Sequence, residues 1–250
     1  MGTSMVNHLI DATFQRQIIF ALAAVIIGLF GNAAKAEHGE QTWAQAQKSI
    51  VVVNPVWPGY DRPGFGALKG TAPAGSGVYF SIDGAEESIF IITAAHVVNA
   101  AKSIEIIDFS GNVATAMIHA IDARRDIAIL RTELIGTGIA VRQDEPLIGS
   151  HVCALGNSFG LGTGMTCGIV SAVRRSNIGF NEIEDFIQTD AAVNPGMSGG
   201  ALVDPQGRLV GLIDGIFTKE ADIDAGVNFA ISVPLIQQSL ASQVKAGVQF

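Results

Sequence analysis

The chain has 250 residues, of which 48% are hydrophobic, 15% are charged and 29 are glycine. This length fits one large domain or two small ones, and frequent glycine is typical of tight turns between short strands rather than of a helical bundle. A formal net charge of −8, with no basic run longer than a pair, excludes nucleic acid as an expected partner.

The beginning of the chain has the features of a secretory signal peptide. Arg16 precedes the apolar stretch Ile18–Phe30, and the sequence AAKA then offers a cleavage site that ends at Ala36. The apolar stretch is short for a membrane span, which favours export with cleavage over a retained N-terminal membrane anchor. We therefore expect a signal peptide or anchor at 1–36 and one domain at 37–250, located in the periplasm or otherwise outside the cytoplasm.

Beyond the leader, short apolar runs alternate with Gly, Asn, Asp and Pro. Their lengths and spacing predict an all-β sandwich or barrel rather than repeated βαβ units. Residues 54–77 form the one long connection, which is dense in Gly and Pro and of a length that is usually functional or disordered. The main runs are SIVVVNP, SGVYFSI, SIFIITAAHVV, SIEIIDF, ATAMIHAI, DIAILRT, HVCALG, CGIVSAV, DFIQTD, GALVD, RLVGLIDGIF and GVNFAISV.

A helix is predicted at the end of the chain. From Pro234 the pattern changes to PLIQQSLASQVKA, whose apolar residues recur at helical spacing. The helix is expected to pack onto the barrel and to close the domain, with no second domain after it. The residues on its expected packing face are Leu235, Ile236, Ser239, Leu240 and Val244.

The segment NPGMSGGAL, residues 194–202, holds a serine between glycines. A hydroxyl is a weak nucleophile until a nearby base takes its proton, and a third group usually orients that base. GMSGG also matches the nucleophile elbow of α/β-hydrolases, whose triad runs Ser, acid, His, but no histidine follows Ser198. The order His, Asp, Ser remains open.

Among the histidines, His96 is the best candidate for the base. It ends the apolar run IITAAHVV, where a turn of small residues lets the imidazole project into a cleft. His119 and His151 lie in ordinary strand patterns, for which a structural role is the simpler interpretation.

Among the acids, Asp126 is the best candidate to orient that base. It begins the apolar run DIAIL, and a buried carboxylate needs a partner, which the Nδ1 of His96 would supply. Asp122 is interpreted as a solvated turn residue, and Asp108 is a weaker candidate.

The two cysteines, Cys153 and Cys167, allow two interpretations. If HVCALG and MTCGIVSAV are the arms of a hairpin, the thiols can face each other, and an exported protein can oxidise them. Two buried free cysteines fit the pattern equally well, and neither interpretation makes them catalytic. We expect no metal ion and no cofactor, because the sequence has no H-E-x-x-H, paired Cys-x-x-Cys, phosphate-binding loop or dinucleotide-binding pattern.

Eight segments in a fixed order resemble the protease domain of the HtrA (Deg) family of trypsin-like serine proteases. They are SGV, TAAHVV, DIAIL, ALGNSFGLG, CGIVSAV, IQTDAAVNPGMSGGAL, GRLVGL and VNFAISVP. The resemblance covers most of residues 49–245 and implies a chymotrypsin-like double β-barrel, with His96 as general base, Asp126 orienting it and Ser198 as nucleophile. The backbone N–H groups of Gly196 and Ser198 would form the oxyanion hole, since glycine lets the backbone turn its N–H toward the substrate.

The resemblance also assigns a specificity pocket. It places Ala192 at the floor of the S1 pocket, with Val193 and Ile231 nearby. No carboxylate lies at that floor, so a small or medium aliphatic P1 residue is expected rather than Lys or Arg. Plain core packing is the competing interpretation for the segment that contains Ala192 and Val193.

The sequence departs from the family at two points. Met197 precedes the nucleophile, where digestive relatives carry aspartate and HtrA proteins usually asparagine, so activation by propeptide cleavage is not expected. Met197 is expected to affect how readily residues 194–198 adopt the conformation that presents the oxyanion donors. The PDZ domain that follows the protease in this family is not expected here. The loops 174–185 and 214–226 either sense ligands or partners or are solvated connections.

The leading hypothesis is an exported serine endopeptidase that cleaves unfolded or damaged envelope proteins through an acyl-enzyme. Its expected partners are polypeptide substrates, a membrane if the leader is retained, and further copies of the chain. One alternative is a catalytically silent, peptide-binding or chaperone-like member of the same fold, in which residues 194–198 stay collapsed. Another is an esterase, which would turn over small esters without cleaving unfolded protein.

Overall fold

The computed structural model of the chain describes residues 34–57, 62–63, 71–72, 74–81, 86–216 and 226–249. Most of the predicted signal or anchor segment and much of the long connection at 54–77 lie outside the described residues. Residues 1–40 and 41–250 form two compact units, and the fold described below is that of the second. Within the described part, no helix combines the length and apolar character that crossing a membrane requires.

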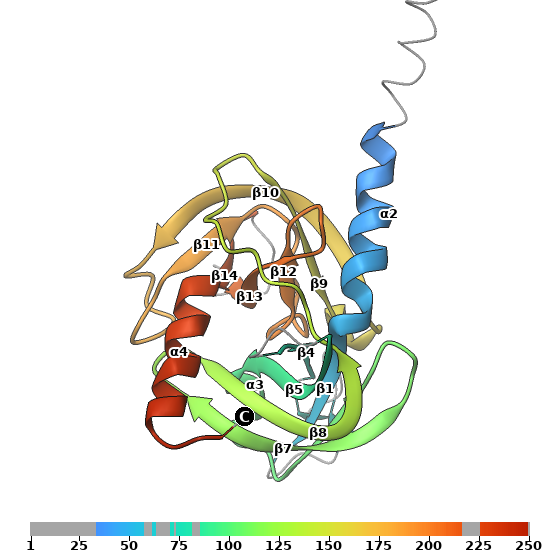
Figure 1. Cartoon of the computed structure of the whole chain (residues 1–250), viewed down its shortest axis with the longest axis vertical. Coiled ribbons are helices and arrows are strands. Elements are labelled where there is room, and N and C mark those ends of the chain that lie inside the picture. The colour runs from blue at the N-terminus through green and yellow to red at the C-terminus, as the bar shows by residue number, and fades with distance from the viewer. Residues whose placement is uncertain are drawn as a thin grey trace, which may run out of the picture. The chain divides into compact units, whose positions relative to one another are not determined.

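The first of two barrels is built from the N-terminal half of this unit. Its strands form a closed barrel in the order β1, β4, β5, β8, β7, β6, and each neighbouring pair is antiparallel (Figure 1). Inward-facing aliphatic side chains fill it, together with the fully buried Tyr79. The strands are β1 (Ile50–Val56), β4 (Gly75–Tyr79), β5 (Glu87–Ala94), β6 (Ser103–Ile107), β7 (Val113–Asp122) and β8 (Ile127–Thr137).

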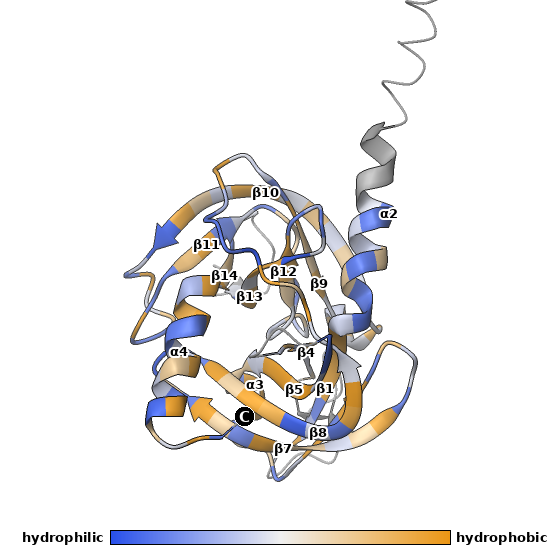
Figure 2. Cartoon of the chain, viewed as in Figure 1, coloured by the Kyte–Doolittle hydropathy of each residue, from blue (hydrophilic) through white to orange (hydrophobic). Residues whose placement is uncertain are grey.

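The second barrel follows with the same architecture. Its strands form a closed barrel in the order β10, β11, β14, β13, β12, β9, and all neighbouring pairs are again antiparallel. Hydrophobic and hydrophilic residues mix along the strands of both barrels (Figure 2). This is expected where one face of a strand meets a core and the other meets water. The strands are β9 (His151–Gly156), β10 (Gly164–Arg175), β11 (Phe186–Thr189), β12 (Ala201–Val203), β13 (Leu209–Ile216) and β14 (Asn228–Ser232).

Short elements complete the description. The strands β2 (Arg62–Pro63) and β3 (Thr71–Ala72) pair in parallel within the long connection. The helical elements are α2 (Ala34–Ala46), η1 (Gln47–Ser49), α3 (Ala95–Val98), η2 (Ser158–Gly160) and α4 (Val233–Lys245). The prediction of an all-β double barrel with a C-terminal helix is confirmed.

The C-terminal helix α4 begins where the sequence predicts. The hydroxyl of Ser232 caps it by accepting a hydrogen bond from the Leu235 N–H at 3.3 Å, and Pro234 occupies the first turn, where its missing N–H costs nothing. Leu235, Ile236 and Ser239 are buried, but Val244 is 52% exposed. Its assignment to the packing face was wrong, because Val244 stands in the last turn of the helix, where its side chain is exposed to solvent.

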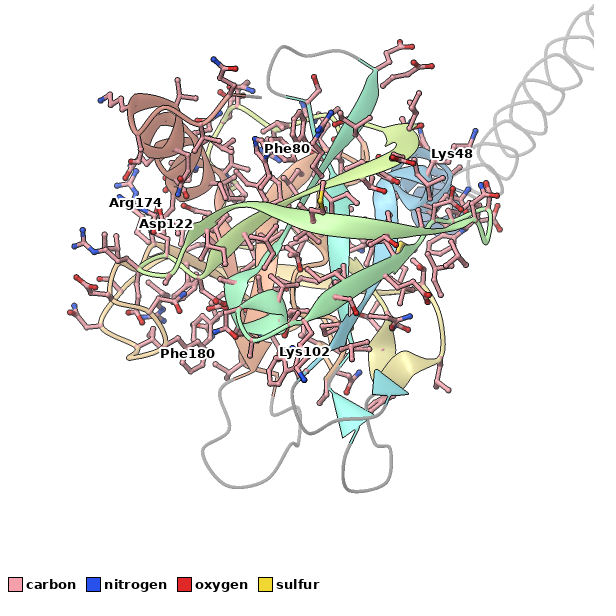
Figure 3. All side chains as sticks on the ribbon, turned by 90° about the horizontal axis from the view of Figure 1, so that it is seen from below. Lys48, Phe80, Lys102, Asp122, Arg174 and Phe180 are labelled. Atoms are coloured by element: carbon pink, nitrogen blue, oxygen red, sulfur yellow. A yellow bond between two sulfur atoms is a disulfide. The ribbon has the colours of Figure 1, made fainter. Side chains whose placement is uncertain are left out.

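Asp122 also differs from its prediction as a solvated turn residue. Its carboxylate is buried, forms an ion pair with Arg125 at 2.8 Å and accepts a hydrogen bond from the Ser239 hydroxyl at 2.8 Å (Figure 3). Asp122 therefore ties the end of β7 to α4, a contact between distant segments that local pattern does not reveal.

Candidate active site

His96 and Asp126 meet because β5 and β8 are neighbours. The register pairs Ala94, at the end of β5, with Ile127, at the start of β8, so the residues just beyond each end lie together. His96 sits on the single helical turn of α3, and its Nδ1 lies 2.5 Å from Oδ2 of Asp126. The backbone N–H of His96 donates to the other carboxylate oxygen at 2.7 Å, and the Ala95 N–H donates to the Asp126 carbonyl at 3.0 Å.

This contact determines the charge state of Asp126. Burial raises the pKa of the Asp126 carboxyl, but the hydrogen bonds and charge of His96, with a hydrogen bond from Asp214, outweigh burial and lower the pKa overall. An ionised carboxylate that accepts from Nδ1 selects the imidazole tautomer whose Nε2 is free to accept a proton.

Ser198 lies between β11 and β12 of the second barrel, in contact with the first. Its carbonyl accepts a hydrogen bond from the Ser76 N–H at 2.9 Å, and Gly75 of the same strand adjoins both the Ser198 carbonyl and the Val97 side chain next to His96. Its hydroxyl donates to the backbone carbonyl of Asp214 at 3.0 Å. The docked barrels therefore bring Ser198 to the His96–Asp126 pair.

The loop before Ser198 presents two backbone donors. The Pro195 carbonyl accepts a hydrogen bond from the Phe159 N–H at 2.8 Å. Because the C=O and N–H of one trans peptide point in opposite directions, this contact aims the Gly196 N–H away from Phe159. Among the described residues, the N–H groups of Gly196 and Ser198 donate no hydrogen bond.

Two features keep the loop in this conformation. Gly196 has a φ of 95°, and a Cβ on it would lie 2.2 Å from the carbonyl oxygen of Asn157, so only glycine fits. The buried hydroxyl of Ser76 donates to the Gly196 carbonyl at 2.8 Å and accepts from the Asn157 N–H at 2.7 Å. Met197 is 1% exposed and packs in the core of the second barrel. The loop before Ser198 therefore adopts this conformation with an apolar side chain, and no ion pair, at position 197.

Sequence reasoning missed one acid in the site, Asp214 of β13. It is 5% exposed, its Oδ2 accepts a hydrogen bond from the Asn181 side chain at 3.1 Å, and side-chain atoms of His96, Asp126 and Asp214 lie within 4.8 Å of one another. Burial, followed by the hydrogen bond and negative charge of Asp126, raises the pKa of Asp214 well above its usual range. The signal was present in RLVGLIDGIF, because a carboxyl group inside an apolar strand requires a partner.

The three residues predicted to line the S1 pocket occupy different surroundings. Ala192 is partly exposed, and its carbonyl accepts a hydrogen bond from the Thr166 hydroxyl at 2.5 Å. Val193 is 3% exposed and packs in the same core as Met197, and Ile231 is 0% exposed in the larger core between the barrels and α4. The side chains of Val193 and Ile231 thus belong to the core, and of the three only Ala192 has surface to offer a substrate.

The remaining candidates lie apart from this site. His119 is on β7, with its Nε2 2.6 Å from the Gln249 carbonyl and its ring against Phe90. Asp108 is in an exposed turn, where it accepts hydrogen bonds from Asn112.

Cys153 and Cys167 face each other across β9 and β10 and form a disulfide, which decides between the two interpretations of the sequence. With His151 they make up one of two described clusters of metal-ligand type, but sulfur atoms in a disulfide are not thiolate ligands. The other cluster is His96, Asp126 and Asp214, in which His96 and Asp126 are already hydrogen-bonded to each other.

Comparison with known proteins agrees with this geometry. The family model of the trypsin-like peptidase domain matches residues 75–212, more than half of the chain. A probable periplasmic serine endoprotease DegP-like of Buchnera aphidicola subsp. Baizongia pistaciae is 37% identical over 158 residues, which cover 62% of this chain and 34% of that protein. The periplasmic serine endoprotease DegP of Escherichia coli strain K12 is 35% identical over 176 residues, which cover 69% of this chain and 36% of that protein.

A solved structure extends the comparison to the fold. The HtrA-type protease AlgW with tripeptide superposes with a TM-score of 0.72 at 32% identity, covering 84% of this chain and 64% of that one. The chain spans about a third of the length of the two curated relatives. The resemblance to HtrA proteases and the chymotrypsin-like double barrel that it implies are confirmed. Matched along both barrels by sequence and by structure, the chain belongs to the family of trypsin-like peptidases.

Proposed function

We propose that the chain is a serine endopeptidase that hydrolyses peptide bonds through an acyl-enzyme, with His96, Asp126 and Ser198 as its catalytic residues. The observation that carries the proposal is the hydrogen-bonded His96–Asp126 pair next to a serine loop whose N–H groups at 196 and 198 have no acceptor among the described residues. An imidazole oriented by a carboxylate activates a hydroxyl for acyl transfer, and two free N–H groups stabilise the oxyanion that results.

The reaction begins with a rotation of the Ser198 side chain. Its hydroxyl leaves the Asp214 carbonyl, to which it donates at 3.0 Å, and donates instead to Nε2 of His96. As Oγ bonds to the carbonyl carbon of the scissile peptide, its proton passes to Nε2, and Asp126 stabilises the imidazolium. The N–H groups of Gly196 and Ser198 receive the negative carbonyl oxygen.

The second half of the reaction restores the enzyme. His96 gives its proton to the leaving amine as the C–N bond breaks, which leaves the acyl group esterified to Ser198. A water molecule then attacks this ester while His96 takes one of its protons, and the same proton returns to Oγ as the acid product leaves. No cofactor or metal ion takes part in these steps.

The proposed location and substrates are supported by the relatives and by the leader. The Escherichia coli protein is described as a periplasmic serine endoprotease, and the apolar leader at 1–36 fits export. We propose that the substrates are unfolded or damaged polypeptides of the cell envelope. Ala192 favours a small aliphatic P1 residue, because its side chain is a single methyl group, which is apolar and carries no charge to pair with Lys or Arg.

Labelling of the full chain with a fluorophosphonate probe, located by mass spectrometry, tests the proposal. We expect labelling at Ser198 that is abolished in Ser198→Ala and in His96→Ala. His151→Ala is the matched control, because His151 is exposed and lies outside the site, and it should label at the wild-type rate.

Casein digestion separates the proposed activity from its alternatives. Labelling together with casein cleavage supports an endopeptidase, whereas labelling with turnover of small esters alone identifies an esterase. A folded chain that is not labelled, but suppresses aggregation of an unfolded client, would overturn the proposal in favour of a peptide-binding protein.

A further inference from the structure

Asp214 is a carboxyl group in the middle of an apolar strand. It follows Ile213 on β13 and is 5% exposed, while Asp126, which it contacts, is 8% exposed. Two carboxyl groups so close in a buried site cannot both be ionised at low cost, because each charge loses its hydration and repels the other.

The hydrogen bonds indicate which group holds a proton. Carboxylate oxygens of Asp126 and Asp214 lie within 4.8 Å of each other, and an ionised carboxylate only accepts hydrogen bonds, so the two groups can share a hydrogen bond only if one of them is protonated. Asp126 accepts from the backbone N–H of His96 at 2.7 Å and pairs with its Nδ1 at 2.5 Å, which favours the ionised form. Asp214 accepts one hydrogen bond from the neutral amide of Asn181 at 3.1 Å. The proton therefore belongs to Asp214.

We propose that Asp214 is a positioning residue of the active site, which retains its proton and donates it in a hydrogen bond to Asp126. The inference rests on the proposed function, since it gives Asp214 a part in the same catalysis. A third donor to the Asp126 carboxylate holds it in the orientation that meets both donors of His96. The chain of hydrogen bonds then runs from Asn181 through Asp214 and Asp126 to His96.

The charge on this hydrogen-bonded series of side chains depends on pH. The titratable groups that face Asp214 are Asp126, His96 across it, and Glu184 of the loop that carries Asn181. Burial first, and Asp126 second, raise the pKa of Asp214, so it stays neutral when ordinary carboxyl groups are ionised. When the proton is lost at higher pH, Asp214 no longer donates to Asp126, and a second negative charge lies beside that carboxylate.

Two substitutions separate the proton from the shape of the side chain. Asp214→Asn has the same shape, never ionises, and can donate to Asp126 through its NH₂ while its oxygen accepts from Asn181. Asp214→Ala removes the donor. Asp144→Asn is the matched control, because it removes one carboxylate from an exposed position outside the site.

The first measurement is the rate of fluorophosphonate labelling of Ser198 in the full chain across pH. Asp214→Asn should label close to the wild-type rate at neutral pH and lack the decline that the wild type shows as pH rises. Asp214→Ala should be slower by roughly 10- to 100-fold, as expected for a lost hydrogen bond to a charged group. The inference is overturned if Asp214→Asn is as slow as Asp214→Ala, or if Asp214→Ala labels like the wild type.

The second measurement is urea unfolding across pH, which does not depend on activity. Above the usual pKa of a carboxyl group, the unfolded chain releases the Asp214 proton while the folded chain keeps it, so this residue lowers stability as pH rises. The unfolding midpoint of Asp214→Asn should exceed that of the wild type by a margin that widens with pH, and Asp144→Asn should show no such trend. A constant or shrinking margin would mean that Asp214 is ionised.

The two measurements keep the two proposals apart. If the wild type is not labelled, the proposed function fails, and the unfolding series still decides whether Asp214 holds a proton. If the wild type is labelled and the three Asp214 forms do not differ, the proposed function stands and the inference fails.

Discussion

Asp126 and Gly196 both have a positive φ, at 55° and 95°. For a residue with a side chain this backbone conformation costs about 1–2 kcal/mol. At Asp126 the cost is offset by its contacts, because the conformation lets one carboxylate meet both the N–H and the Nδ1 of His96. Gly196 has no side chain and so adopts this φ without that cost, in a loop whose Gly196 N–H points away from Phe159.

The substitution Gly196→Ala tests the second of these positions. A methyl group would lie 2.2 Å from the Asn157 carbonyl, so the loop must shift and withdraw a donor. We expect fluorophosphonate labelling of Ser198 to fall by about 100- to 1000-fold, the loss typical of one oxyanion donor. The unfolding transition should remain cooperative, which circular dichroism in urea measures.

Gly149→Ala is the matched control for this change. Gly149 has a φ of 87°, but a methyl group there would have nothing within 4 Å. It therefore carries the backbone cost without the collision. If both substitutions reduce labelling equally, the collision with Asn157 is not the reason for the glycine at 196.

At the scale of elements, the loop between β10 and β11 is held by one acid. The Glu184 carboxylate accepts hydrogen bonds from four successive backbone N–H groups, those of residues 178–181, at 2.7 to 3.1 Å. The loop thus presents Asn181 to Asp214, and its Phe180, labelled in Figure 3, packs on Phe229. A loop that loses this conformation would also lose the Asn181 end of the hydrogen-bonded series proposed above.

The substitution Glu184→Gln should loosen this loop. Burial alone would raise the pKa of Glu184, but the four N–H donors outweigh burial and lower it. Its contribution to stability is therefore present above the pKa of the unfolded state and is lost as pH falls through the folded value. Hydrogen exchange at residues 178–181, expressed as protection factors, should show reduced protection in the variant at neutral pH and in the wild type at acid pH.

Glu182→Gln is the control for the loop, since Glu182 lies in the same loop and forms an exposed ion pair with Arg124. Exposed ion pairs contribute little, so protection at residues 178–181 should stay near the wild-type level. Equal protection in Glu184→Gln would show that the aromatic contacts, rather than the carboxylate, hold the loop.

At the scale of the whole molecule, the site exists because two barrels dock. The first contributes His96 and Asp126, and the second contributes Ser198 and Asp214, so no single barrel holds all the residues of the proposed site. The disulfide lies within the second barrel, where it joins β9 to β10 on either side of Phe159, whose N–H donates to the Pro195 carbonyl in the loop before Ser198.

Removing the disulfide should destabilise the chain as a unit. Cys153 and Cys167 are 14 residues apart, and closing a loop of about 15 residues lowers the entropy of the unfolded chain by an amount worth about 3 kcal/mol. The double variant Cys153→Ser, Cys167→Ser should lose roughly that free energy of unfolding in urea. The wild type in reducing agent should unfold at a similar midpoint, and an unchanged midpoint in both samples would contradict the prediction.

Much of this molecule is readable from local pattern. The alternating apolar runs predict the strands, the change of period at Pro234 predicts α4, and the order His96, Asp126, Ser198 predicts which residues come together. The strands and the helix can be predicted because the spacing of hydrophobic residues and the positions of turn residues are local in the sequence. The catalytic roles remain predictions, which the labelling experiments test.

Other features depend on contacts between distant segments. Asp122 matches a solvated turn residue by local pattern, but Arg125 and Ser239 of α4 enclose it, and Val244 matches the apolar spacing of the helix but is exposed in its last turn. The disulfide required the register of β9 against β10.

Asp214 is the clearest case of the division between sequence and structure. The sequence alone determined the strand pattern, the family and the order of the three candidate catalytic residues. It also placed a carboxyl group in an apolar strand, but that carboxyl meets Asp126 only when one barrel packs on the other. Only the tertiary structure decided this partner, because the cost of burying a charge depends on which groups surround it, and those groups come from elements far apart in the chain.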